Sequence, residues 1–214
     1  MGILDNEIKS LDGRIREMAG VMEKNLFYAS DVYLHFDPLK TYPPVDDQKV
    51  NRFERRIEST CLQIRLKERL FADDLRIVTG IRSMVQDLER LGDHAQDLLQ
   101  FALKIKNPST NNPEIADLTD FIRKRVSDAV KSYRNRDTNL AQDVLSRDDH
   151  VDKEYEKLLA SMVKWTETGK CTPLFSIYSA LVVKYLERIA DHATNIAEWV
   201  IYIVTGYYKD RQIL

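Results

Sequence analysis

The sequence predicts an all-α protein built from two tandem three-helix bundles that are related by an internal repeat. The chain of 214 residues has only seven glycines and six prolines, and 43% of its residues are hydrophobic, which is typical of helical proteins. Apolar residues recur every three or four positions over long stretches. In addition, the octet LERLGDHA at 88–95 returns as LERIADHA at 186–193, and such a repeat indicates two related units.

The first half of the chain has the apolar spacing of three helices. The expected elements are a helix over about 4–34, a proline-containing loop over 37–45, a second helix from about 46 to a turn near 71–72, and a third helix to about 105. Asp73 and Asp74 are N-cap candidates for the third helix.

The second half repeats this plan. The expected elements are a helix from Pro113 to about Tyr133, a short helical piece at 140–145, a helix from about Asp148 to Gly169, and a last helix from Pro173 to about Tyr208. No stretch predicts a strand. The first bundle is therefore expected over residues 1–106 and the second over 113–214, with residues 107–112 as the linker.

Composition excludes several classes of function. The net charge of −2 argues against a nucleic-acid-binding protein, which usually carries a strong basic excess. Cys61 and Cys171 have no metal or redox spacing and suit a reducing compartment. The N-terminus does not resemble a signal peptide. The longest apolar run, 199–205, is far shorter than the ~20 residues of a membrane span. We therefore expect a cytoplasmic protein without membrane insertion.

Acidic residues recur at helical spacing in both octets. Glu89 and Asp93 stand one turn apart, as do Glu187 and Asp191, and Asp97 extends the first row by a further turn. These acids lie away from the apolar stripe, so the predicted site is on the outer surface, in or beside a groove between two helices.

A second set of polar residues begins the neighbouring helix of each unit. It consists of Asp47 and Asn51 in the first unit and Asp148 and Asp152 in the second. If each helix pair is an antiparallel hairpin, these residues fall beside the acids of the octets. Asp47 is expected level with about residue 96, and Asp148 with about residue 192.

Two interpretations of these acids remain open. They could be solvated surface residues that Arg90, Arg188 and Lys153 neutralise, because exposed like charges repel each other only weakly. They could instead bind divalent or trivalent metal ions (iron, Mn, Mg, Zn or Ca), because the donors are nearly all oxygen. A buried di-iron centre is disfavoured, because neither octet has the Glu-x-x-His that it needs. His94 and His192 are expected to be solvated or core-edge residues rather than ligands.

At this point the motifs resemble a known family. FADDLRI at 71–77 followed by DLERLGD at 87–93 is similar to the third helix of the PhoU family, and LERIADHATNIA at 186–197 is similar to its sixth. Asp148-x-x-Val151-Asp152 matches the start of its fifth helix. The resemblance covers essentially the whole chain.

The resemblance implies a fold, a site and a role. The fold is two three-helix bundles related by a pseudo-twofold axis, with Glu/Asp-x-x-x-Asp motifs that bind metal clusters at the surface. The role is that of a cytoplasmic, non-enzymatic regulator that restrains phosphate uptake and phosphate-starvation signalling. It acts through the phosphate ABC transporter and, in many bacteria, a membrane sensor histidine kinase, and a homodimer is allowed.

Two other functions stay open on the sequence. One is a metal-dependent phosphate-ester hydrolase that uses the same carboxylates, although no nucleophile–base pair or glycine-rich phosphate loop is evident. The other is a purely structural helical adaptor. Because Asn51 gives the first site one carboxylate fewer, the second site is expected to hold cations more tightly.

Overall fold

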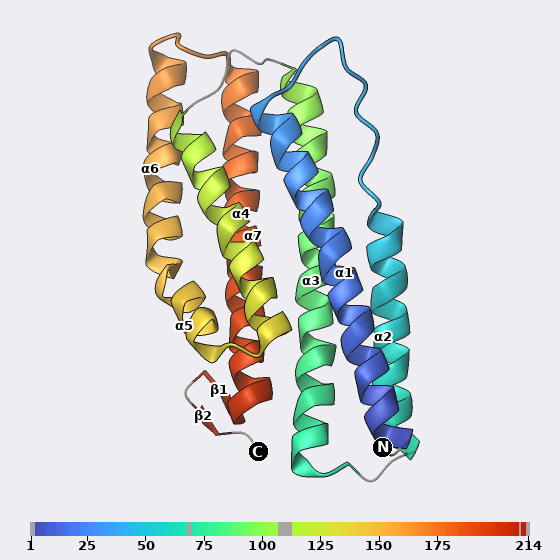
Figure 1. The fold of residues 1–214 in the computed structure, drawn as a ribbon. Coiled ribbons are helices and arrows are strands. Elements are labelled where there is room, and N and C mark those ends of the chain that lie inside the picture. The colour runs from blue at the N-terminus through green and yellow to red at the C-terminus, as the bar shows by residue number, and fades with distance from the viewer. Residues whose placement is uncertain (1–2, 68–69, 107–112, 210, 213–214) are drawn as a thin grey trace.

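The computed structural model describes residues 3–67, 70–106, 113–209 and 211–212 and has the predicted all-α fold (Figure 1). Its elements are α1 (Ile3–Leu34), α2 (Asp47–Lys67), α3 (Ala72–Ile105), α4 (Pro113–Asn135), α5 (Thr138–Ser146), α6 (Asp148–Glu167), α7 (Pro173–Thr205), β1 (Tyr207–Tyr208) and β2 (Arg211–Gln212). Helices α1, α2 and α3 pack as one bundle, and α4, α6 and α7, with the short α5, pack as the other. The predicted linker, 107–112, lies outside the described residues.

Local capping signals set several helix ends. Asp46 precedes α2 and accepts a hydrogen bond from the Lys49 backbone N–H (3.2 Å). Thr172 caps α7 by accepting from the backbone N–H of Phe175 (3.2 Å). Gly169 follows the end of α6 with a φ of 69°, the left-handed conformation that glycine adopts without strain.

Two predicted boundaries are wrong. The N-cap of α3 is Phe71, so Asp73 and Asp74 lie within the first turn, where their charges interact favourably with the helix dipole. Helix α7 ends at Thr205 rather than near Tyr208, because Gly206 takes the left-handed conformation (φ 83°). The chain then turns back, and β1 pairs antiparallel with β2, although the sequence predicts no strand.

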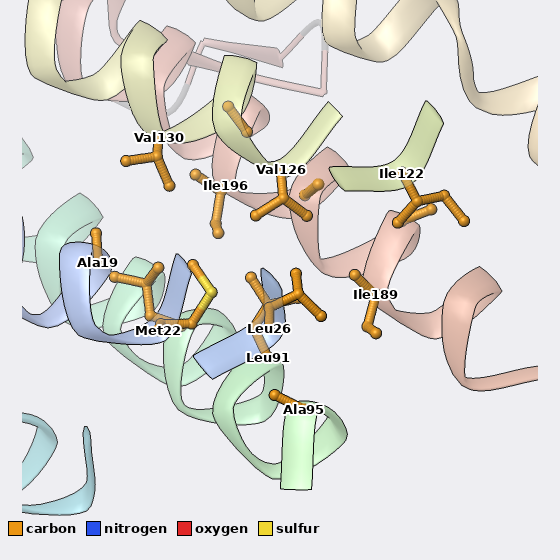
Figure 2. Packing of buried hydrophobic residues seen from close by; sticks show 14 of the residues in the cluster. Ala19, Met22, Leu26, Leu91, Ala95, Ile122, Val126, Val130, Ile189 and Ile196 are labelled. Atoms are coloured by element: carbon orange, nitrogen blue, oxygen red, sulfur yellow. The ribbon is translucent and has the colours of Figure 1, made fainter. Parts of the chain in front are cut away.

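A single cluster of buried apolar side chains extends through both bundles. Figure 2 shows that α1, α3, α4 and α7 all contribute side chains to its centre. Those labelled are Ala19, Met22, Leu26, Leu91, Ala95, Ile122, Val126, Val130, Ile189 and Ile196. The apolar stripes predicted from the sequence therefore face one shared core.

Helices α3 and α7 lie antiparallel along the boundary between the bundles. The Arg76 guanidinium, near the start of α3, donates to the carbonyl of Ile203, near the end of α7 (3.0 Å). A Cβ added at Gly80 would lie only 2.3 Å from Ile203 Cγ1, so glycine permits this close approach. At the middle, the rings of His94 and His192 are 5.4 Å apart. The two octets thus meet each other, as expected from an approximate twofold axis.

Candidate functional site

The first acidic cluster comprises Asp47, Asn51 and Glu54 of α2 with Glu89 and Asp93 of α3. The side-chain amide of Asn51 donates to Asp47 Oδ2 (2.9 Å). Helix α3 passes close by, because a Cβ added at Gly92 would lie 3.2 Å from Val50 Cγ1 and 3.6 Å from Asp47 Oδ1. The predicted hairpin is confirmed, and Asp47 lies about one turn from its predicted level.

The carboxylates of the first acidic cluster repel one another. Burial, followed by the charge of Asp93, raises the pKa of Asp47. Burial, then Asp93 and Glu54, raises the pKa of Glu89. The Arg90 guanidinium relieves part of this repulsion, at 3.6 Å from a Glu89 oxygen and 3.4 Å from an Asp93 oxygen. An added positive charge would therefore be stabilised here.

The second acidic cluster comprises Asp148 and Asp152 of α6 with Glu187 and Asp191 of α7. Burial, followed by the charges of Glu187, Asp148 and Asp152, raises the pKa of Asp191. The four acids that the sequence predicted therefore come together.

Two basic side chains already neutralise part of the second acidic cluster. Lys184 lies 2.6 Å from a Glu187 carboxylate oxygen. Arg125 of α4 is fully buried, and its Nη2 lies 2.6 Å from Asp148 Oδ1. Arg125 was not among the residues singled out from the sequence.

Glu54 is another residue that sequence reasoning missed. It follows Asp47 and Asn51 on the same face of α2, and its charge raises the pKa of Glu89. The first cluster thus has four carboxylates, as many as the second, in which Tyr155 stands at the position equivalent to Glu54. The carboxylate count therefore gives no reason for tighter cation binding at the second cluster.

Asp97 does not belong to the first acidic cluster. Its carboxylate faces Tyr185 of α7, where its charge and a hydrogen bond raise the tyrosine pKa after the effect of burial. The reason is helical geometry: each step of four residues advances the side chain by about 40° around the helix. Two such steps after Glu89, the side chain points to the boundary between the bundles.

The histidines of the octets belong to a polar group at this same boundary. His192 Nδ1 lies 2.9 Å from Asp87 Oδ1, and the Asn195 amide donates to the same oxygen (3.0 Å). His94 is 8% exposed, and its ring meets that of Tyr185 edge-on at 5.1 Å. Both histidines thus lie at the edge of the core, which is one of the two places that the sequence allowed for them. Asp87, buried on α3, was missed because it falls between apolar positions.

The donor chemistry of the first acidic cluster fits a hard cation. Asp47 Oδ1 and Asn51 Oδ1 are buried and have no hydrogen-bond partner within the described part of the chain. Oxygen donors of this kind suit Mg, Ca and Mn. Among the described residues, however, no three His, Cys, Asp or Glu side chains already stand where they could hold a metal ion. Binding would therefore require carboxylates such as Glu89 and Asp93 to rotate.

Two described hollows between α1 and α2 lie away from both acidic clusters. One of about 570 Å³ between α1 and α2 is lined by Ser10, Gly13, Arg14, Glu17, Phe53 and Arg56. A neighbouring hollow shares Arg14 and Arg56 and adds Arg55. None of the acids of either cluster lines these two hollows. Within the described chain, no helix is both long enough and apolar enough to cross a membrane.

Comparison with known proteins identifies the relatives of this chain. A family profile described as the PhoU domain matches residues 15–102 and again 115–200. The chain is 31% identical to a phosphate-specific transport system accessory protein PhoU homolog of Pseudomonas putida (94% of this chain, 80% of the relative). It is 32% identical to the homolog of that name from Synechocystis sp. (94% and 91%). These names describe accessory proteins rather than enzymes, in agreement with the prediction.

Solved structures agree with this assignment. The crystal structure of PhoU from Pseudomonas aeruginosa superposes with a TM-score of 0.84 at 27% identity, covering 95% of this chain and 99% of that one. The phosphate transport system regulatory protein PhoU from Streptococcus pneumoniae shares the fold, with a TM-score of 0.81 at 20% identity over 97% of this chain and all of that one. Both halves of the chain match the family, and the chain belongs to the PhoU family.

Proposed function

We propose that this chain is a regulator that restrains phosphate uptake and phosphate-starvation signalling. The observation that carries the proposal is the match of the PhoU domain to both bundles. The names of the relatives, which are accessory proteins of the phosphate-specific transport system, support it. A regulator of this kind works by contact rather than by catalysis.

The proposed contacts are with cytoplasmic parts of a phosphate ABC transporter and of a membrane sensor histidine kinase. Helices of 32 to 34 residues (α1 and α3) give the molecule long faces with a fixed pattern of charges. Such rigid faces suit recognition by another protein, because little conformational freedom is lost on binding. This role places the chain in the cytoplasm.

A bound cation at the first acidic cluster is part of the proposal. Asp47, Glu89 and Asp93 would hold it, with Glu54 and the Asn51 carbonyl oxygen as neighbours, and it would supply positive charge to a strongly negative surface. The raised pKa of Asp47 and Glu89 supports this assignment, because the ionised carboxylates lack sufficient positive charge. At the second cluster Arg125 already supplies such a charge.

The test is complementation of a bacterial strain that lacks its own PhoU. The wild-type chain should restore normal intracellular phosphate, whereas a Glu89→Gln, Asp93→Asn double variant should fold, lose bound metal and leave phosphate elevated. Both substitutions keep the size of the side chain, and neither residue belongs to the buried core, so we expect unchanged helical content by circular dichroism.

The matched control is Glu187→Gln, Asp191→Asn in the second cluster, which should retain metal. A metal-free first-cluster variant that restores normal phosphate would favour the adaptor function. Failure of the wild-type chain to restore phosphate would refute the proposed role in that host.

A homodimer, which the family resemblance allows, is also proposed. The apolar end of α7 is not a free surface for it, because Trp199 stacks on Tyr208 (4.2 Å between ring centroids) and Ile203 is buried. This region therefore packs largely against its own chain. Sedimentation at tens of micromolar is the measurement, and a single monomeric species would exclude a strong dimer.

A further inference from the structure

The two acidic clusters occupy equivalent places in the repeat, and this allows them to be compared residue by residue. Residues of α1 correspond to those of α4 at a spacing of 100, those of α2 to α6 at 101, and those of α3 to α7 at 98. Buried residues match under these spacings. Examples are Ile15 with Ile115, Met22 with Ile122, Val50 with Val151, Ile57 with Leu158, and Leu91 with Ile189.

In the second unit, a buried guanidinium supplies a positive charge beside Asp148 through its Nη2, while its Nε and Nη1 are buried without a hydrogen-bond partner among the described residues. Arg125 is 0% exposed. Its Nη2 donates to Asp148 Oδ1 (2.6 Å) and lies 2.6 Å from Thr194 Oγ1. The Thr194 hydroxyl also donates to Asp148 Oδ1 (3.0 Å). Because arginine stays protonated at any physiological pH, this cluster contains a permanent positive charge.

The residues of the first unit that are equivalent to Arg125 and Thr194 carry no charge. Asn25 stands at the position of Arg125, and Gln96 at that of Thr194. In this unit, four atoms are buried and lack a hydrogen-bond partner among the residues described: Asn25 Nδ2, Gln96 Oε1, Asp47 Oδ1 and Asn51 Oδ1. The first is a donor nitrogen, and the other three are oxygens that could accept from a donor or bind a cation. Buried polar atoms are nearly always satisfied in folded proteins. Two of these oxygens, Asp47 Oδ1 and Asn51 Oδ1, belong to the first acidic cluster, beside mutually repelling carboxylates, and this points to a cation as the missing ligand.

We propose that Arg125 is a built-in cation of the second acidic cluster, so that a hard divalent cation binds at the first cluster and is excluded from the second. This inference rests on the proposed cation at the first cluster. The guanidinium already donates to Asp148 Oδ1, an oxygen that a metal ion would need as a ligand. Its positive charge also repels any other cation at short range. The two halves of the repeat thus reach charge balance by different means.

The experiment exchanges Asn25 and Arg125, singly and together, and measures the number of bound Mn²⁺ ions by equilibrium dialysis. Asn25→Arg should weaken Mn²⁺ binding at the first cluster at least tenfold. Arg125→Asn should add a new class of Mn²⁺ site to those of the wild-type chain. The double exchange should restore the wild-type stoichiometry with the site moved to the second cluster. Glu89→Gln and Glu187→Gln, combined with each variant, report which cluster holds the ion.

Each outcome is decisive. If Arg125→Asn folds, as judged by circular dichroism, and gains no Mn²⁺ that Glu187→Gln removes, the inference is overturned even though the first cluster binds. If wild type binds no Mn²⁺ but Arg125→Asn does, the first-cluster proposal fails and the role of Arg125 stands. Arg125→Gln replaces Arg125→Asn if the latter does not fold. A wild-type chain that loses Mn²⁺ on Glu187→Gln contradicts the inference directly.

Discussion

Leu91→Ala is expected to lower the free energy of unfolding of the whole chain by about 2–5 kcal/mol, the usual effect of such a cavity in a core. Leu91 is fully buried on α3, and its side chain points into the centre shared by four helices (Figure 2). For a chain of this length, the loss corresponds to a decrease in melting temperature of about 4–20 °C.

The variant also tests whether the two bundles unfold together. Both tryptophans of the chain, Trp165 and Trp199, lie in the second bundle, whereas Leu91 lies in the first. Because one apolar cluster joins the bundles, the urea transition followed by tryptophan fluorescence should shift as far as the one followed by circular dichroism.

The control is Leu62→Ala on α2, where the side chain is 59% exposed and the expected loss is below about 0.5 kcal/mol. A Leu91→Ala protein whose fluorescence transition stays at the wild-type position, while part of the helical signal is lost earlier, would show that residues 1–106 and 113–214 behave as independent domains.

Helical periodicity in the sequence predicted most of the fold correctly, because these helices are long and amphipathic. Over more than 30 residues in α1 and α3, a period of 3.6 cannot be confused with that of a strand. The ends of the helices were harder to predict, because capping depends on single residues. Gly206 was the available signal for the end of α7, and the aromatic residues after it obscured that signal by continuing the apolar pattern.

The acidic clusters were predictable because a repeated hairpin places equivalent residues side by side. Glu54 could have been found by extending the row on α2 by three residues after Asn51, which keeps the same helix face. Asp97 was misplaced because a row of i, i+4 residues drifts around the helix. The four-residue spacing therefore predicts neighbours over one step better than over two.

Arg125 was not predictable from the acidic motifs, since it comes from a third helix. Its signal lies in α4, where Ile122 and Val126 flank it and Leu118 lies two turns before it, all buried. A charged residue within an apolar stripe either reaches the surface or pairs inside. Which of these happens depends on Asp148, which is distant in sequence, so only the packed structure decides it.

Acidification from about pH 6.5 to pH 4 is expected to cost the native state up to about 3 kcal/mol through His94 alone. Burial, then the charges of His192, Arg188 and Arg90, lowers the pKa of His94 from 6.5 to about 4. Across that interval the unfolded chain binds a proton at this residue and the folded chain does not. Stability therefore falls with falling pH, and each pKa unit corresponds to about 1.4 kcal/mol.

Comparison with His94→Gln isolates this effect from that of the acidic clusters. The raised pKa values of Asp47, Glu89 and Asp191 act with the opposite sign, because the folded chain then takes up protons before the unfolded chain does. The two proteins share these carboxylates, so the difference between their urea-derived stabilities at each pH reports His94. Wild type should lose stability relative to His94→Gln on going from pH 7 to pH 4. Parallel pH profiles for the two proteins would mean that His94 is readily protonated in the folded state.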